Sequence, residues 1–122
     1  MDRFSGKVAI VTGGGNGIGA AIVERLSREG ASVVIVDREE DAAKEIAKKT
    51  GGTALGGDVS DPQTALNAVK TAVSKYGNLN IVICNAGITD RSPFLEMTPE
   101  FFERVIGINL KGSFYFAQAA AK

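Results

Sequence analysis

The stretch Val11-Thr-Gly-Gly-Gly-Asn-Gly-Ile-Gly-Ala20 decides the fold of this 122-residue chain. It follows an apolar run, residues 7–12, that predicts a strand buried on both faces, and it leads into a pattern over residues 17–29 that predicts an amphipathic helix. Glycines at such a junction let the backbone approach a phosphate closely, and the helix N-terminus offers free N–H groups and a positive dipole end. The stretch therefore predicts a nucleotide-binding turn. It contains a general dinucleotide fingerprint, Gly15-x-Gly17-x-x-Ala20, although a glycine-rich turn without a ligand is the alternative.

The same alternation of strand and helix patterns continues along the chain. Apolar runs predict strands at residues 32–37, 53–57 and 79–84, and helical periodicity predicts helices at 39–49, from a Ser60 cap to a stop at Gly77, and from Thr98-Pro99 to the last residue. The apolar residues expected on the inner helix faces are Ile18, Ile22, Leu26, Ala42, Ala43, Ile46, Ala47, Ala65, Leu66, Val69, Ala72, Val73 and Tyr76. This order predicts one α/β domain over residues 1–122, with a parallel sheet and right-handed crossovers.

Composition excludes several classes of function. Lys and Arg together number 14, as do Asp and Glu, so charge gives no reason to expect nucleic acid or a membrane as partner. The chain has no histidine and a single cysteine, Cys84, which removes Ser-His-Asp and Cys-His catalysis and leaves no expected metal site. We find no secretory signal and no apolar run of membrane-spanning length, and therefore expect a cytoplasmic, reduced environment.

Asp37 ends the second predicted strand, and Gly17 precedes it by 20 residues. An acid at this place can accept hydrogen bonds from both hydroxyls of an adenosine ribose and repel a 2′-phosphate, which favours NAD over NADP. Two alternatives remain: Arg38 could pair with a 2′-phosphate, and Asp37 could only cap the next helix. We expect NAD to be preferred to NADP.

Five motifs follow one another in the order typical of a single enzyme family. They are Thr12-Gly13-x-x-x-Gly17-Ile18-Gly19, Asp37, Asp58-Val59, Asn85-Ala86-Gly87 and Asn109-x-x-Gly112. On these motifs, which run the length of the chain, the sequence closely resembles the short-chain dehydrogenase/reductase family. The resemblance implies a Rossmann-type parallel sheet with strand order 3-2-1-4 and helices on both faces, truncated after the fourth βα unit. It also implies hydride transfer between a nicotinamide cofactor and a small-molecule carbonyl or alcohol.

The resemblance implies a role for each matched residue. The pyrophosphate turn would consist of Gly13, Asn16, Gly17, Ile18 and Gly19; Asp37 would hold the ribose; Asp58 and Val59 would face the adenine; and Asn85, Ala86 and Gly87 would lie beside the cofactor. Asn109 is the one catalytic candidate, because the backbone of the family's helix asparagine helps to hold a water of the proton relay. Without the resemblance, these later motifs would be interpreted as a strand end, a turn and a helix-bending polar residue.

The chain departs from the family pattern in its fourth strand and in its catalytic residues. Cys84 stands where the family usually has Asn, and Asn80 where it often has Asp; we interpret Cys84 as a small buried residue and not as a nucleophile. The family's chemistry needs a Ser and a Tyr-x-x-x-Lys pair, but Tyr76 is followed four residues later by Asn80, and Tyr115 by Ala119. We therefore expect a cofactor-binding half that is inactive alone. A non-catalytic NAD-binding module and one piece of a split enzyme are the alternatives.

The sequence also predicts surfaces that lack a partner. In the order 3-2-1-4 the fourth strand is an edge, yet no charge or proline protects it. In the last helix the polar residues form a narrow stripe: Glu100, Arg104, Lys111, Gln118 and Lys122. On the family resemblance we expect a further helix and a second subunit to cover the rest, and hence a homo-oligomer. Residues 89–97, part of a predicted loop over 85–97, could form one wall of the substrate pocket but identify no substrate.

Overall fold

The computed structural model describes residues 2–88 and 93–122. Its elements are β1 (Val8–Thr12), α1 (Gly17–Arg28), β2 (Ser32–Asp37), α2 (Glu40–Thr50), β3 (Thr53–Gly56), α3 (Pro62–Tyr76), β4 (Ile81–Ile83), the 3-10 turn η1 (Phe94–Glu96), α4 (Pro99–Val105), the π-helix η2 (Ile106–Lys111) and α5 (Gly112–Ala121). In the ranges described, none of the helices combines the length and the apolar character needed to cross a membrane.

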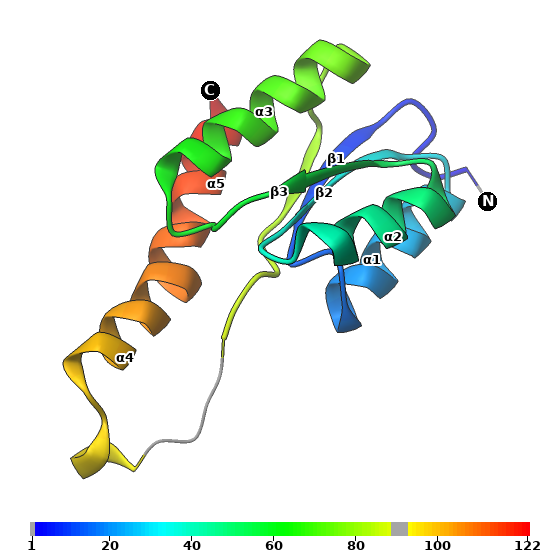
Figure 1. Cartoon of the computed structure of the whole chain (residues 1–122). Helices are drawn as coiled ribbons and strands as arrows, with labels where there is room; N and C mark the ends of the chain where they lie inside the picture. The colour runs from blue at the N-terminus through cyan, green and yellow to red at the C-terminus, as the bar shows by residue number, and fades with distance from the viewer. Residues whose placement is uncertain (1, 89–92) are drawn as a thin grey trace.

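The four strands form one parallel sheet in the predicted order, β3-β2-β1-β4. β1 pairs with β2 along its whole length, from Val8 opposite Ser32 to Thr12 opposite Val36. Helices α1 and α2 cover one face of the sheet, and α3 and α5 cover the other (Figure 1). Because the strands are parallel, their carboxyl ends meet at one edge, and the polar residues that follow each strand gather there.

Alternate residues of the two central strands build two separate cores. Val8, Ile10, Val34 and Val36 pack toward α3 and α5, whereas Ala9, Val11, Val33 and Ile35 pack toward α1 and α2. The first core also contains Phe116 of α5, whose side chain is fully buried. The two-residue period of a strand therefore assigns a core to each face, which explains why neither central strand shows polar alternation.

Alanines, and not larger apolar residues, hold α3 against the sheet. Ala65, Ala68 and Ala72 are buried, whereas Leu66 and Val73 are 54% and 47% exposed. Small side chains allow the helix to approach the sheet closely, and the two larger residues lie one position, about 100°, further round the helix. The prediction that Leu66 and Val73 face inward was wrong for this reason.

Asp61, and not Ser60, caps α3. The Asp61 carboxylate accepts a hydrogen bond at 2.9 Å from the N–H two residues later, and Pro62 takes the first helical position. Ser60 instead donates its N–H and its hydroxyl to Asp58. The predicted start of the last helix is confirmed, because the Thr98 hydroxyl accepts a hydrogen bond from an N–H of the first turn of α4.

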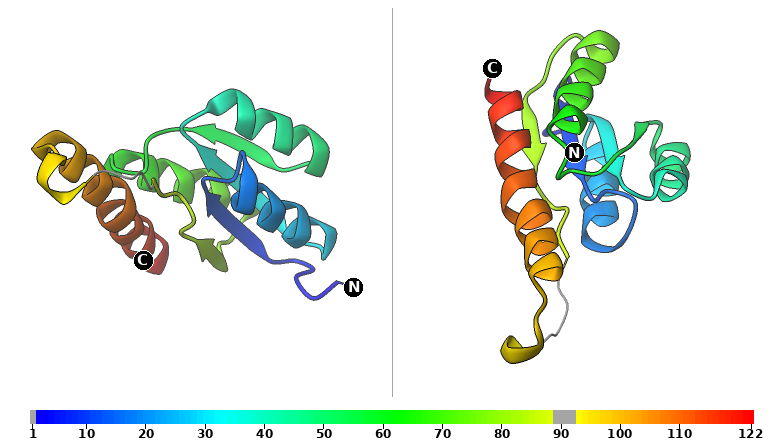
Figure 2. Two further views of the ribbon diagram at one scale, coloured as in Figure 1. Left: turned by 90° about the horizontal axis from the view of Figure 1, so that it is seen from below. Right: turned by 60° about the vertical axis from the view of Figure 1, so that its left-hand side comes forward.

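The last helix is one continuous rod with an irregular middle (Figure 2). The prediction of a single α-helix was wrong over η2, where the hydrogen bonding is that of a π-helix. This segment buries Gly107 and Ile108 and directs Asn109 toward the loop after β4. Immediately after it, Gly112 packs closely on Val59, since a Cβ at Gly112 would lie 2.7 Å from Val59 Cγ2. π-turns within helices often accompany functional sites.

β4 is the open edge of the sheet, as predicted. Within the described residues it pairs with β1 alone, and its three residues are half-buried. The adjoining Asn80 exchanges two hydrogen bonds with Val8: its Oδ1 accepts from the Val8 N–H at 2.9 Å, and its own N–H donates to the Val8 carbonyl. The departure from the family pattern at Asn80 therefore leaves the β1–β4 pairing intact.

Large apolar side chains are exposed along the continuous helical segment formed by α4, η2 and α5. Phe102, Leu110 and Phe114 are 51%, 63% and 56% exposed. The unpartnered apolar surface that the sequence predicts is therefore present. The second subunit expected to cover it remains a prediction.

A buried carboxylate fastens the N-terminal segment to α1. The side chain of Glu29 is 3% exposed, and it accepts hydrogen bonds from Arg3 at 2.5 and 2.7 Å and from Arg25 at 2.6 Å. The hydrogen bond from Arg3, followed by that from Arg25, lowers the pKa of Glu29 from 4.5 to about 2. The ionised form of Glu29 therefore stabilises the folded chain.

We expect the stability of the fold to decrease as Glu29 titrates. The pKa of Glu29 is lower in the folded chain than in the unfolded chain. The stabilisation that ionised Glu29 gives the fold is therefore complete above pH 4.5 and is lost as the pH falls toward about 2. Glu29→Gln should lower the melting temperature at neutral pH and flatten its dependence between these pH values. Thermal unfolding across this range tests the expectation, with Glu45→Gln on the exposed face of α2 as control. An unchanged pH profile in Glu29→Gln would contradict it.

Candidate functional site

A pocket of about 430 Å³ opens at the carboxyl edge of the sheet. Its walls come from the segments that follow the four strands and from η2: Gly13, Asn16, Asp37, Arg38, Glu39, Gly57, Asp58, Val59, Asn85, Ala86, Gly87, Ile88 and Ile108. The strand order reverses between β1 and β4, and ligands of open α/β sheets bind in the crevice at such a point.

The hydroxyl of Thr12 joins the ends of β1 and β4. Thr12 is 2% exposed, and its Oγ1 accepts hydrogen bonds from the N–H groups of Asn85 and Ala86, both at 3.0 Å. Asn85 in turn donates from Nδ2 to the Gly13 carbonyl at 3.3 Å. The glycine turn and the Asn85-Ala86-Gly87 motif are therefore one hydrogen-bonded unit.

Within the described residues, no side chain caps the N-terminus of α1, which follows the glycine turn. Asn16 stands at the N-cap without a side-chain capping bond, and the first turn contains no acidic residue. Gly13 and Gly17 adopt φ of +65° and +55°, which other residues rarely do. Ile18, predicted to face the core, is 75% exposed because it lies in this first turn, at the carboxyl edge of the sheet. The positive end of the α1 dipole therefore suits an anion such as a pyrophosphate.

Gly19 allows α1 to start directly against the turn. A Cβ at this position would overlap the Gly13 carbonyl oxygen and would lie 2.5 Å from Asn85 Nδ2. At Gly13 itself, a Cβ would lie 3.0 Å from Ala86 Cα. The backbone cradle is thus closed to side chains, which is the geometry that a dinucleotide pyrophosphate requires.

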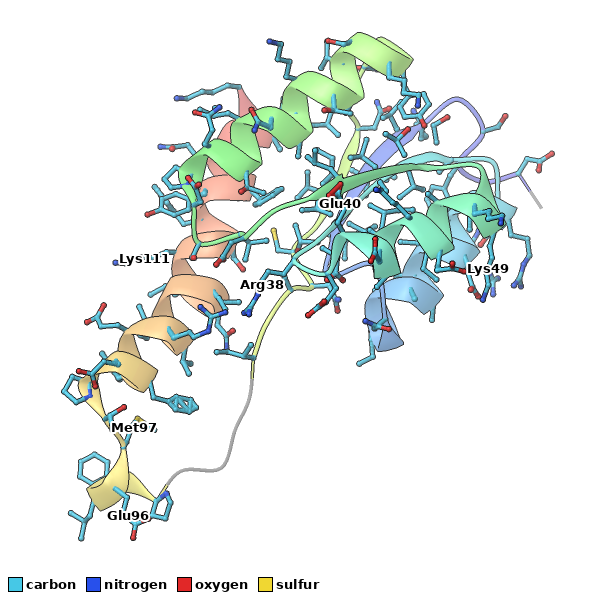
Figure 3. All side chains as sticks on the ribbon, in the orientation of Figure 1. Arg38, Glu40, Lys49, Glu96, Met97 and Lys111 are labelled. Atoms are coloured by element: carbon cyan, nitrogen blue, oxygen red, sulfur yellow. The ribbon has the colours of Figure 1, made fainter. Side chains whose placement is uncertain are left out.

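Asp37 is held at the pocket wall from two sides. Its Oδ2 accepts a hydrogen bond from the Gly15 N–H at 2.9 Å, and its Oδ1 accepts one from the Glu39 N–H at 2.8 Å. Each oxygen retains a further lone pair for a ligand. Arg38 follows at the same wall, and its side chain points from the end of β2 toward the side of the long helical rod (Figure 3).

The side chain of Asp58 is held in place by hydrogen bonds from Ser60, two residues later in the chain. Its Oδ1 accepts hydrogen bonds from the Ser60 hydroxyl at 2.7 Å and from the Ser60 N–H at 2.9 Å. The hydroxyl bond is the largest of the effects that lower the pKa of Asp58, and the charge of Arg38 acts in the same direction. Asp58 is therefore an ionised carboxylate at neutral pH.

Asn109 fixes the loop after β4. Its Oδ1 accepts a hydrogen bond from the Ile88 N–H, and its Nδ2 donates to the Ile88 carbonyl, both at 2.9 Å. Its own backbone carbonyl accepts a hydrogen bond from the Ser113 hydroxyl at 3.1 Å. Asn109 does not line the pocket, so the structure makes it a positioning residue for Ile88. Its role in a proton relay remains a prediction.

Most of the predicted cofactor residues meet at the pocket, but not all. Gly17, Ile18 and Gly19 form the start of α1 and do not line it, whereas the others do. The lining residues that the prediction missed are Glu39, Gly57, Ile88 and Ile108, together with Arg38, which was considered only as a residue favouring NADP. Each lies within two positions of a predicted motif residue in the sequence, which is the one signal that could have found them.

Cys84 is exposed, which corrects the prediction that it is buried. It follows β4, which pairs with β1 alone within the described residues, and desolvation raises the pKa of its thiol. Over residues 2–88 and 93–122, no three His, Cys, Asp or Glu side chains group as metal ligands. Four of the residues 89–97, the predicted wall of a substrate pocket, lie outside the part described.

The same fold and the same site motifs occur in a known family of enzymes. The chain belongs to the short-chain dehydrogenase family, whose model matches residues 7–122. It is 42% identical over 126 residues to elsinochrome reductase 1 of Elsinoe fawcettii, covering 98% of this chain and 47% of that protein. It is 40% identical over 128 residues to L-rhamnose-1-dehydrogenase of Scheffersomyces stipitis, covering 98% and 50%. The chain thus spans about half the length of the curated relatives it matches.

Solved structures of the same family superimpose closely. A short-chain dehydrogenase/reductase of the glucose/ribitol dehydrogenase type from Brucella melitensis gives a TM-score of 0.94 at 30% identity, over 98% of this chain and 52% of that one. The 3-ketoacyl-(acyl-carrier-protein) reductase of the same organism, crystallised with NADH, gives 0.92 at 35% identity, over 95% and 49%. The family is one of oxidoreductases that use NAD or NADP.

Proposed function

We propose that this chain is the cofactor-binding part of an NAD(P)-dependent oxidoreductase that transfers a hydride between the nicotinamide and a small carbonyl or alcohol. The observation that carries the proposal is the pocket in which Gly13 and Asn16 of the glycine turn, the Asp37 carboxylate and the Asn85-Ala86-Gly87 segment meet. A bound nicotinamide cofactor supplies the hydride chemistry, and the chain supplies the binding and orientation.

Each wall of the pocket would hold a different part of the cofactor. The backbone N–H groups at the start of α1, beside the pocket, would bind the pyrophosphate, since they lie at the positive end of the helix dipole. The N–H groups of Gly14 and Gly15 would not take part, because they donate to the Val36 carbonyl and to Asp37. Asp37 would accept the ribose hydroxyls, and the Asp58-Val59 segment would contact the adenine. Asn85, fixed through Thr12, would keep the remaining wall in place. These roles follow from position in the fold and from the family resemblance.

We propose that the cofactor is NAD in preference to NADP. Among the described residues, the pocket is lined by three carboxylates, Asp37, Glu39 and Asp58, and by one cation, Arg38. A 2′-phosphate would bring additional negative charge to this wall, whereas a ribose diol can donate hydrogen bonds to Asp37. The similar reductase crystallised with NADH is consistent with this preference.

Binding of NADH and NADPH to the full chain, measured by titration calorimetry, tests the proposed function. We expect NADH to bind more tightly, and Asp37→Ala to narrow the ratio of the two dissociation constants by about tenfold, because one lost charge-assisted pair is worth roughly 1.4 kcal/mol. Asp41→Ala, an exposed acid in the first turn of α2, is the matched control and should leave the ratio unchanged. Tighter binding of NADPH by the unaltered chain would reject the NAD preference, and binding of neither nucleotide would reject the function.

The residues for proton transfer would come from outside residues 1–122. Neither Tyr76 nor Tyr115 is followed by Lys at the fourth position, so we propose that the chain alone binds the cofactor without turnover. The same observation favours a second candidate, a non-catalytic NAD-binding module, or one piece of a split enzyme. Turnover of a carbonyl substrate by the 122-residue chain alone would contradict all three hypotheses: the inactive cofactor-binding part, the non-catalytic module and the piece of a split enzyme.

We further propose that the protein is a cytoplasmic homo-oligomer whose second subunit covers the exposed side chains of Leu110 and Phe114.

A further inference from the structure

Gly15 belongs to the glycine turn, yet its contacts are made with β2 and α2. Its N–H donates to Asp37 Oδ2 at 2.9 Å, while the neighbouring Gly14 N–H donates to the Val36 carbonyl at 3.2 Å. The opposite oxygen of Asp37 is taken by the Glu39 N–H at 2.8 Å. The carboxylate is therefore clamped between the turn that would bind the pyrophosphate and the loop that leads into α2.

The clamp has no room for a side chain at position 15. A Cβ added to Gly15 would lie 2.8 Å from Asp37 Oδ2, 2.9 Å from the Cβ of Ala42 and 3.1 Å from the Ala42 carbonyl carbon. Ala42 is part of the helix backbone, and its neighbour Ala43 is fully buried, so α2 cannot move away without opening the core. The carboxylate of Asp37 is the group free to give way.

The backbone of Gly15 would accept another residue. Gly15 is not among the glycines with positive φ, in contrast to Gly13 and Gly17. Alanine at position 15 therefore avoids the strain of a positive φ, and we expect the contacts of the added Cβ to dominate its effect. A substitution at position 15 can therefore displace the Asp37 carboxylate while residue 37 remains aspartate.

We propose that Gly15 is a positioning residue for cofactor selectivity: by its N–H and by its missing side chain it holds the Asp37 carboxylate where it can distinguish a ribose 2′-hydroxyl from a 2′-phosphate. The proposal rests on the proposed function. It adds that selectivity at the ribose is set by a residue of the pyrophosphate turn as well as by the acid at the end of β2. The general dinucleotide fingerprint includes this glycine but gives it a different role, that of allowing the tight turn.

Gly15→Ala tests the proposal against a matched control, Gly14→Ala. Both glycines lack positive φ, and in both a Cβ would meet a neighbour at 2.8 Å, but at Gly14 that neighbour is the core side chain of Ile35. We expect Gly15→Ala to narrow the NADPH-to-NADH ratio of dissociation constants by about five- to tenfold, approaching that of Asp37→Ala. Gly14→Ala should lower the melting temperature because it overpacks the core, and should leave the ratio within about twofold.

A double variant separates an effect through Asp37 from a direct one. In an Asp37→Ala background, adding Gly15→Ala should produce no further change in the ratio, because its target is already absent. A ratio that is unchanged in the single Gly15→Ala variant, or that changes equally in both backgrounds, would overturn the inference and leave the proposed function standing. Failure of the unaltered chain to bind either nucleotide would instead overturn the proposed function and the selectivity that depends on it.

Amide hydrogen exchange in the nucleotide-free protein tests the clamp by itself. Asp37→Ala should accelerate exchange at the Gly15 N–H, which loses its acceptor, and should leave exchange at the Gly14 N–H unchanged, since its acceptor is the Val36 carbonyl. Equal protection of Gly15 in both proteins would show that the N–H does not depend on the carboxylate and would overturn the clamp, whatever the nucleotide titrations show.

Discussion

Gly19→Ala is expected to weaken nucleotide binding strongly. In an ordinary helix this substitution stabilises the chain by up to about 1 kcal/mol. Here the new Cβ would overlap the Gly13 carbonyl oxygen and crowd Asn85 Nδ2, so either α1 must withdraw or the turn must open. Both changes move the helix N–H groups away from the place where a pyrophosphate would bind. We expect the affinity for NADH to fall on the order of a hundredfold, about 2.7 kcal/mol.

Gly107→Ala is the control for this substitution. It makes the same chemical change in a helical segment, where the new Cβ would meet, among the described residues, Ser60 Cβ at 3.5 Å. Its affinity for NADH, measured by the same calorimetric titration, should stay within about twofold of the unaltered chain. If Gly19→Ala also binds NADH with unchanged affinity, the close approach of α1 to the turn is not needed for binding, and the assignment of the turn to the pyrophosphate is contradicted.

Thr12→Val should destabilise the fold and the site together. Valine has a similar shape, but it removes the oxygen that accepts hydrogen bonds from Asn85 and Ala86. Two backbone N–H groups at the junction of β1 and β4 would then lack their acceptor, at a cost of about 1–3 kcal/mol each. We expect a loss of about 2–4 kcal/mol in the free energy of unfolding, measured by urea titration, and weaker NADH binding because Asn85 is no longer held beside Gly13.

Thr12→Ser separates the hydroxyl from the packing of the methyl group. Serine retains an oxygen that can accept both hydrogen bonds, so Thr12→Ser should recover most of the stability and of the NADH affinity lost in Thr12→Val. The opposite order, with serine the more harmful change, would show that the methyl group and not the hydroxyl joins the two strands.

The sheet and the position of the pocket could be predicted because their signals are local. The apolar runs of β1 and β2 are continuous because both faces are covered, and the glycine turn and Asp37 stand directly after them. Since parallel strands end at one edge, adjacency in the sequence was enough to bring these residues to one pocket. The resemblance to a known family then indicated which later segments would join them.

The residues that face the sheet from the helices, and the burial of residues at the edge strand β4, were predicted less well. A helical period marks several neighbouring positions as apolar, and it does not say whether an alanine or a leucine faces the sheet. Ala68 and Ala72 took that place in α3 and left Leu66 exposed, because small residues allow closer packing. Cys84 looked like a core residue, yet it is exposed because its strand pairs on one side only among the described residues.

The sequence by itself determined the βα alternation, the turn between β1 and α1, and the acid at the end of β2, because each depends on residues close together in the chain. Only the tertiary structure decided how the site is held. Thr12 reaches residues more than 70 positions away, Asn109 pairs with Ile88 across 21 residues, and Gly15 clamps Asp37 across 22. Such hydrogen bonds have no local pattern, since a donor and an acceptor far apart in sequence meet only after the sheet has formed.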